Sequence, residues 1–319
     1  VYVKYLLSSG YPPDGIPAKG QPLERALFWS SELILPLLDA KATVDTRHVD
    51  IAICHRLPEI VDKLLEPASP SQRGIEKAVR ANLLEMIRRC VAKGCRVGSS
   101  ALRRAQSAEM VDVLLSAKCD VNATSSAGVP AFLGCCYLGS VEAVQRMVKR
   151  GARVDVRDKL GNTALHYACW EATAAFLLDD CKLAADYPNA RGETALFIQE
   201  GLKDRGSIVL QVLVLRGLDV NARDQAGRTP LLSAAQFGTL EHHEALVELN
   251  ADLHVTSGDG SNALHFAAGN KSLWPERIIR FLLDSGVPVN QPDAMDRTEL
   301  HKATFRSAPE LLSRGAEVR

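Results

Sequence analysis

Histidine is the residue type in this sequence whose chemistry first suggests a site. His166, His265 and His301 occupy the same place in three recurring segments, and imidazole is both a common metal ligand and a common general base. The segments lie far apart along the chain, so each histidine has its own surroundings. Each can hydrogen-bond backbone or hydroxyl groups of a neighbouring segment. We therefore expect these histidines to be structural.

The remaining motifs lack the partners that their chemistry needs. His242 and His243 are adjacent, so on a helix they point in different directions and do not form the His-Glu-x-x-His pair of a zinc site. Residues 258–263 match a GxGxxA string, but a dinucleotide fingerprint needs a preceding strand. The sequence contains no GxxxxGK[ST] phosphate loop and no GxSxG nucleophile motif. We expect no catalytic, cofactor-binding or metal-binding residues, and hence no enzyme.

The sequence has 8 cysteines and no Cys-x-x-Cys pair. Most of them fall at apolar positions of expected helices, where cysteine packs as a small hydrophobe. This pattern favours reduced thiols in a cytoplasmic or nuclear protein. Cys135 and Cys136 are adjacent, and Cys136 aligns with an exposed position, so redox sensing there is a hypothesis.

The elements that must position these residues are revealed by an internal repeat. An apolar pair, often followed by Gly or Asn, recurs eleven times at intervals of roughly 30 residues, from Leu6-Leu7 to Leu311-Leu312. A second signature precedes the later pairs by about half a period: Thr163–His166, Thr194–Phe197, Thr229–Leu231, Asn262–His265 and Thr298–His301. Thr or Asn can cap a helix, Leu points into a core, and a following Ala allows close packing.

These segments resemble the ankyrin-repeat family, whose unit carries Thr-Pro-Leu-His-x-Ala. The resemblance implies an all-α solenoid of about ten helix pairs with short β-hairpin loops. It is strong over residues 120–319 and degenerate over residues 1–119, where the shorter period predicts helix pairs without well-formed hairpins. We expect the two parts to be continuous as one solenoid.

Composition limits the partners. The chain has 319 residues, 46% of them hydrophobic, so it can bury a large core, and its 38 Lys plus Arg balance 38 Asp plus Glu. That balance argues against nucleic acid, and no apolar stretch is long enough to span a membrane. The chain starts at Val1 without a signal-peptide layout, so we expect an excerpt of a longer protein.

One stretch departs from this balance. Residues 80–104 carry seven basic side chains against Glu85 alone: Arg80, Arg88, Arg89, Lys93, Arg96, Arg103 and Arg104. Such a patch fits an acidic protein partner, but solvated helix faces carry similar charge. Nucleic acid is a third interpretation, which the lack of an aromatic ladder for stacking bases disfavours, and the sequence leaves the choice open.

The resemblance implies that the concave face of the array binds protein. The candidate residues stand at repeat positions that the apolar pattern does not assign to the core. They are Lys159, Asn162, Trp170, Glu171, Gln225, Arg228, Gln236, Phe237, Asn270, Met295, Arg297 and Phe305. Trp170, Phe237 and Phe305 form an aromatic row of the kind that anchors interfaces, unless they pack sideways against the adjacent repeat.

We therefore predict a non-enzymatic scaffold or adaptor, a monomeric array that binds one or more proteins whose identity the sequence does not give. The alternative is the sensor or substrate-recognition arm of a larger multidomain protein, such as a ubiquitin-ligase receptor or a signalling ATPase.

Overall fold

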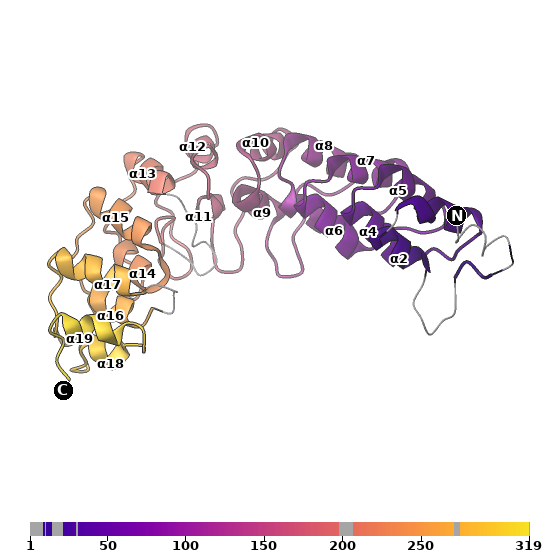
Figure 1. Ribbon diagram of the computed structural model, residues 1–319. Coiled ribbons are helices and arrows are strands. Elements are labelled where there is room, and N and C mark those ends of the chain that lie inside the picture. The colour runs from indigo at the N-terminus through magenta and orange to yellow at the C-terminus, as the bar shows by residue number, and fades with distance from the viewer. Residues whose placement is uncertain are drawn as a thin grey trace. The chain divides into compact units, whose positions relative to one another are not determined.

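The computed structural model describes Ser9 and residues 11–14, 22–29, 31–197, 207–270 and 275–318. The chain forms two compact units, Val1–Ala152 and Arg153–Arg319. In both units short helices alternate between an inner row and an outer row (Figure 1). The part of the chain that is described contains no helix with the length and apolarity that a bilayer span requires.

In the first unit each inner element contacts the next inner element, and from α5 onward each outer helix contacts the next outer helix (Figure 1). The inner row contains α2 (Pro22–Trp29), α4 (Thr46–Cys54), α6 (Gln72–Arg80), the 3-10 helix η3 (Ser99–Arg104) and α9 (Ala131–Leu138). The outer row contains the 3-10 turn η2 (Ser31–Leu33), α3 (Ile34–Asp39), α5 (Pro58–Leu64), α7 (Leu84–Ala92), α8 (Ala108–Ser116) and α10 (Val141–Lys149).

The second unit repeats this order. Its inner row contains α11 (Ala164–Tyr167), α14 (Pro230–Phe237), α16 (Ala263–Ala268) and α18 (Glu299–Lys302), and Thr194–Phe197 form a turn at the equivalent place. Its outer row contains α12 (Glu171–Asp179), α13 (Ser207–Leu215), α15 (Leu240–Glu248), α17 (Pro275–Asp284) and α19 (Ala308–Ser313). The predicted all-α solenoid of stacked helix pairs is confirmed.

The links between helix pairs differ in length along the chain. Residues 40–45, 65–71 and 93–98 join the first pairs by tight turns, whereas residues 117–130 and 150–163 form longer links. The first of the longer links contains the isolated bridge between Thr124 and Pro130, and the Ser125 N–H donates to the Val129 carbonyl at 2.9 Å. A shorter repeat therefore keeps its helices and loses residues from the link.

The helix ends follow from local sequence. The Thr229 hydroxyl accepts a hydrogen bond from the Leu232 N–H at the start of α14, and the Ser71 hydroxyl accepts one from the Gly74 N–H at the start of α6. Both satisfy a backbone donor that has no partner within its own helix. Several outer helices end before a glycine with positive φ, such as Gly217 at 95°, and others end before Lys118, Lys182 or Asn250 in the same left-handed region, which glycine adopts with the least strain.

The core runs between the two rows. Around α16, Leu264, Ala267 and Ala268 are fully buried and pack with Ile279 and Leu282 of the outer helix α17. The small alanines allow the inner helices to approach closely, and α16 contacts both α14 and α18. Each helix pair therefore buries its apolar face only when its neighbours are in place.

The adjacent histidines of α15 lie in this core. His243 is fully buried, its Nδ1–H donates to the Thr239 carbonyl at 2.9 Å, and its ring packs edge-on against Phe281 at 6.4 Å. Burial removes water from the charged imidazolium and lowers the pKa of His243 to about 4. His243 is thus a neutral core residue.

Replacing Leu264 with Ala should lower the free energy of unfolding by about 2 to 5 kcal/mol, because it leaves a cavity between the two rows. Urea unfolding followed by far-UV circular dichroism measures the loss. The control is Leu312→Ala, since Leu312 of α19 is 49% exposed. Equal midpoints for both variants would contradict the assignment of Leu264 to the core.

Acid should destabilise the protein through His243. The unfolded chain takes up a proton near pH 6.5, whereas folded His243 stays neutral down to about pH 4, so stability is complete above pH 6.5 and falls below it. The loss is about 2 kcal/mol by pH 5. His243→Phe keeps an aromatic ring against Phe281 and removes the titrating group, so its unfolding free energy should fall less between pH 7 and pH 5. Parallel curves for the two proteins would refute this account.

Candidate functional site

Hairpin fingers precede the inner row of the second unit. In each finger the N–H of the first residue donates to the carbonyl of the last at 2.9 to 3.2 Å, and the fourth residue has a positive φ. The fingers are Asp158–Asn162, Asn189–Glu193, Asp224–Arg228, Ser257–Ser261 and Asp293–Arg297. Glycine occupies the fourth place in all of them except the last, where Asp296 stands.

A ladder of backbone hydrogen bonds joins neighbouring fingers. The N–H of the second residue donates to the carbonyl of the third residue in the preceding finger, at 2.8 to 2.9 Å. The pairs are Ala190 with Leu160, Gln225 with Arg191, Gly258 with Ala226, and Ala294 with Asp259. Side chains on the fingertips are therefore held in a fixed register along the unit.

Gly227 shows why the ladder needs glycine. Its φ is 70°, in the left-handed region, and a Cβ atom there would lie 2.7 Å from the amide nitrogen of Gly258 in the next finger. Any larger residue would push the two fingers apart. The glycine thus serves both the turn and the close approach.

A buried polar network lies beneath the first three fingers. The Asn189 amide donates to Asn162 Oδ1 at 2.9 Å and to Glu193 Oε2 at 2.8 Å, and Arg228 Nη2 donates to Glu193 Oε1 at 3.2 Å. Arg228 also donates through Nε to Asp224 Oδ2 at 2.7 Å. These groups satisfy one another across three repeats and fix the bases of the fingers.

Two of the recurring histidines, His166 and His265, join repeats as predicted, whereas His301 is exposed and its Nδ1 accepts from the Thr298 N–H of its own repeat at 3.1 Å. His166 Nδ1 accepts from the Thr163 N–H at 3.1 Å, so the proton belongs on Nε2, which lies 2.9 Å from the Glu193 carbonyl of the next repeat. His265 makes the same contact with the Arg297 carbonyl at 2.9 Å. Within the described residues no cluster of three metal-ligating side chains occurs.

The predicted interface residues fall into three groups by exposure. Six are exposed: Lys159, Trp170, Glu171, Gln225, Met295 and Phe305. Four are half-buried: Arg228, Gln236, Phe237 and Arg297. Two are buried: Asn162 and Asn270. The hydrophobic members of the exposed group are Phe305 at 84%, Met295 at 73% and Trp170 at 60%.

The two asparagines do not belong to the surface. Asn162 is 2% exposed and binds Asp158 and Asn189, and Asn270 is 2% exposed and donates to the Ala235 carbonyl at 2.9 Å. Both positions lie beside loop residues in sequence, but each contacts the neighbouring repeat. Their amides hold adjacent repeats together.

The two arginines are engaged within the fold. Arg228 lies between Glu193 and Asp224, and Arg297 donates to Asp293 through Nε and Nη2 at 3.0 and 2.9 Å. Burial would raise the pKa of Asp293, but hydrogen bonds from Arg297 and from backbone amides outweigh it and hold that pKa well below its usual range. Neither arginine is available as a free charge.

Sequence reasoning missed Leu160. It is 48% exposed at the third place of its finger, the place that Met295 occupies in the last finger. An alignment of the fingers in sequence indicates Leu160, because it is the third residue of its finger, as Met295 is. Tyr187 is also 46% exposed, with the Arg157 guanidinium 3.7 Å above its ring.

The expected exposure of Cys136 is wrong. Cys135 and Cys136 of α9 are both fully buried, and burial raises the pKa of the Cys135 thiol to about 12. The inner helix at this point is covered by η3, with which α9 makes close contact. A thiol with this pKa remains protonated and unreactive near neutral pH, so redox sensing is not supported.

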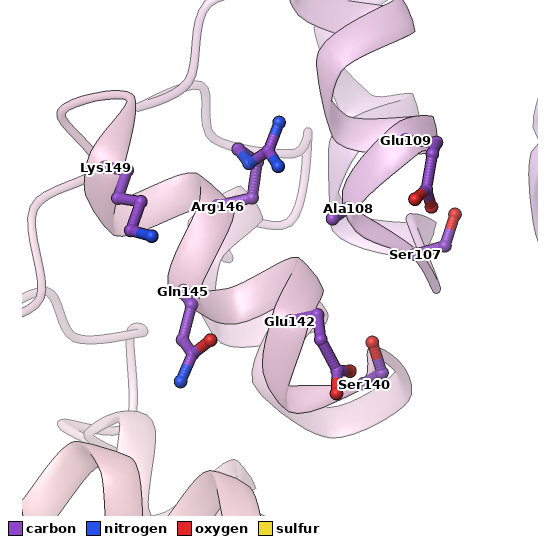
Figure 2. Close-up of a pocket in the computed structure, with 8 residues that line it drawn as sticks. All are labelled: Ser107, Ala108, Glu109, Ser140, Glu142, Gln145, Arg146 and Lys149. Carbon is purple, nitrogen blue, oxygen red and sulfur yellow. The ribbon is translucent and has the colours of Figure 1, made fainter.

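A pocket of about 450 Å³ opens between the first turns of α8 and α10 in the first unit. Figure 2 shows Glu142 beside the Ser140 hydroxyl and Glu109 beside Ser107, with Gln145 and Lys149 along α10. The hydrogen bond from Ser140 lowers the pKa of Glu142. All of the lining residues except Ala108 are polar or charged. The pocket therefore has no apolar wall that would enclose a small molecule.

Replacing Gly227 with Ala should destabilise the fingers more than replacing Gly217 with Ala. Both glycines have a positive φ, so both variants lose about 1 to 2 kcal/mol. A Cβ atom at position 217 would meet no atom within 4 Å, whereas one at position 227 would lie 2.7 Å from the Gly258 nitrogen, and this clash should add about 1 to 3 kcal/mol to the loss. Chemical unfolding of both variants measures the difference, and equal losses would show that the ladder adds no constraint.

Comparison with known proteins places these features in a family. The family model for ankyrin repeats in three copies matches residues 99–189 and 202–293, more than half of the chain. Mouse B-cell lymphoma 3 protein homolog is 29% identical over 178 residues, which are 54% of this chain and 39% of that protein.

Two further relatives are matched over shorter stretches. The nuclear factor NF-kappa-B p105 subunit of chicken is 34% identical over 40% of this chain and 14% of that protein. The neurogenic locus notch homolog protein 1 of Xenopus tropicalis is 32% identical over 40% of this chain and 5% of its own length. The matched stretch is thus well under half of each relative. The stacked helix pairs, the hairpin fingers and the family match together show that this chain belongs to the ankyrin-repeat family.

Proposed function

We propose that the second unit is a protein-binding scaffold or adaptor whose interface consists of the fingertips and the exposed ends of the inner helices. The observation that carries this proposal is the backbone ladder between fingers. A surface that is already in register loses little conformational entropy when a partner binds. The proposed interface therefore combines fixed backbone with variable side chains.

The exposed apolar residues supply anchors for such an interface. Leu160 and Trp170 belong to the first finger and helix pair of the second unit, and Met295 and Phe305 to the last. Between them the fingertips carry small or polar residues, including Ala190, Gln225, Ala226 and Asp259. Aromatic and methionine anchors separated by a polar surface are typical of protein interfaces.

The half-buried and polar residues complete the proposed interface. Lys159 and Gln225 lie on fingertips, and Glu171 begins α12 beside Trp170. Phe237 and Gln236 close α14 and are half-buried, so they support the surface more than they extend from it. A partner would contact the ends of the unit through apolar anchors and its middle through polar groups.

The test compares two double variants. Trp170→Ala with Phe305→Ala removes one anchor from each end of the proposed interface. Ile208→Ala with Leu215→Ala removes two apolar side chains of similar exposure, 52% and 78%, from the outer helix α13. Partners are captured from a native extract with each protein and quantified by mass spectrometry.

Capture should fall about tenfold or more for the first pair and should not change for the second, because anchor residues dominate interface energies. Circular dichroism confirms that both variants stay helical. Loss of partners in both variants, or in the outer-helix variant alone, would contradict an interface on the fingers and inner helices.

The second candidate is the recognition arm of a larger protein. It is favoured by one observation, that each of the three relatives described above extends well beyond the stretch that this chain matches. In that case the interface proposed above would select a substrate or signal for activity located elsewhere. Linking the captured partners to ubiquitin transfer or nucleotide hydrolysis in the same complex would distinguish this candidate from a simple scaffold.

A further inference from the structure

The inner helix α6 carries a stripe of basic side chains. Gly74, Ile75, Ala78 and Val79 are buried, and the opposite side of the helix presents Arg73, Lys77 and Arg80 with Glu76 among them. These positions are spaced i, i+3, i+4 and i+7, so they lie on one face. The stripe follows the full length of α6.

The next inner element extends this surface. The 3-10 helix η3 packs against α6 and carries Arg103 and Arg104, both half-buried. Their Nε–H groups donate no hydrogen bond within the described residues, and Arg104 Nε lies 4.0 Å from Glu76 Oε2. We name the surface formed by Arg73, Lys77, Arg80, Arg103 and Arg104 the inner basic face.

Two outer-row cations of the same stretch are paired with carboxylates. Arg89 of α7 pairs with Asp62 and Glu85, and Lys93 lies 3.6 Å from Glu66. The basic stretch seen in sequence over residues 80–104 is therefore divided. In its outer part Arg89 and Lys93 pair with carboxylates of the outer row, and its inner part joins Arg73 and Lys77 on α6.

The acids near the inner basic face are already engaged. Asp50 of α4 accepts hydrogen bonds from the N–H and hydroxyl of Ser71, and Glu76 accepts one from the Ser100 hydroxyl at 2.8 Å. Arg73, Lys77 and Arg80 make no side-chain ion pair with any of the described residues. Three exposed cations thus lie on one helix face, and the one acid among them, Glu76, is engaged by Ser100 and lies near Arg104.

We propose that the inner basic face binds an extended acidic segment of a partner protein. Adjacent packed helices lie about 10 Å apart, which three residues of an extended chain also span. An acidic residue at every third or fourth place could therefore reach Lys77 on α6 and Arg104 on η3. Arginine binds carboxylates through two parallel hydrogen bonds, and four of the five residues of the inner basic face are arginines, two on α6 and two on η3.

Protein is favoured over nucleic acid for a physical reason. Glu76 lies in the middle of the stripe, where it would repel a continuous phosphate backbone, and a peptide can place a neutral residue there. Neither α6 nor η3 carries an aromatic side chain on which a base could stack. The inner basic face lies in the first unit, so this proposal is independent of the finger interface proposed for the second unit.

The test measures binding of a fluorescent peptide rich in Glu and Asp to the 319-residue chain by anisotropy. A Gln- and Asn-rich peptide of the same length and a single-stranded DNA oligonucleotide serve as comparison probes. The proposal predicts binding of the acidic peptide alone, weakened as the salt concentration rises.

Two triple variants locate the site. Arg73→Glu, Lys77→Glu and Arg80→Glu reverse the stripe on α6 and should weaken binding about tenfold or more. The control reverses exposed cations of the outer helices α5, α7 and α10, with Lys63→Glu, Arg88→Glu and Lys149→Glu, and should leave binding unchanged. Both variants lower the net charge by the same amount.

A third variant guards against misfolding. Arg73→Gln, Lys77→Gln and Arg80→Gln removes the cations without adding acids to one helix face, and it should show the same direction of change with an unaltered circular dichroism spectrum. Equal weakening by the inner and outer variants, or no binding of the acidic peptide by the unmodified chain, would overturn the proposal. Preferential binding of the oligonucleotide, lost with the α6 variants, would assign the face to nucleic acid instead.

Discussion

The structure depends on burial between neighbouring repeats. A helix pair of this length has one apolar face and too little surface to bury it alone, so each pair is stable only against the next. Leu264, Ile279 and Leu282 are fully buried because α14, α16 and α18 stack in order. Since each repeat touches only its neighbours, exposed side chains on the inner row and the fingers are left free to vary.

Hydrogen bonds between repeats then fix the relative orientation of neighbouring repeats, which apolar burial alone does not determine. Apolar packing is not directional, whereas hydrogen bonds are, and the inner-row histidines and asparagines make theirs across repeat boundaries. His166 reaches the Glu193 carbonyl, Asn162 reaches Asn189, and the backbone ladder joins the fingertips. Proteins that bind partners through an array gain from this arrangement, because the spacing between fingers is set before a partner arrives.

Charge is distributed differently on the two rows. In the outer row, carboxylates and arginines of successive repeats pair, as Asp112 does with Arg146 and Arg150, Asp179 with Arg216, and Glu310 with Arg280. The arginines of these pairs are partly exposed, so each pair contributes little stability alone, but it neutralises its own charges on the outer row. On α6 the cations of the inner row have no such partners. The formal net charge of zero for the whole chain therefore conceals a local surface of one sign.

The sequence by itself determined the repeat, the helix pairs and the glycine turns, because caps, apolar periodicity and left-handed residues act over a few neighbours along the chain. Only the tertiary structure decided which side chains are exposed. Asn162, Asn270 and Cys136 are covered by residues about a repeat away, and Leu160 is left uncovered, which no local pattern encodes. Tertiary pairing likewise divided the basic stretch over residues 80–104. Burial and charge pairing depend on distances between repeats, and those distances are set by stacking.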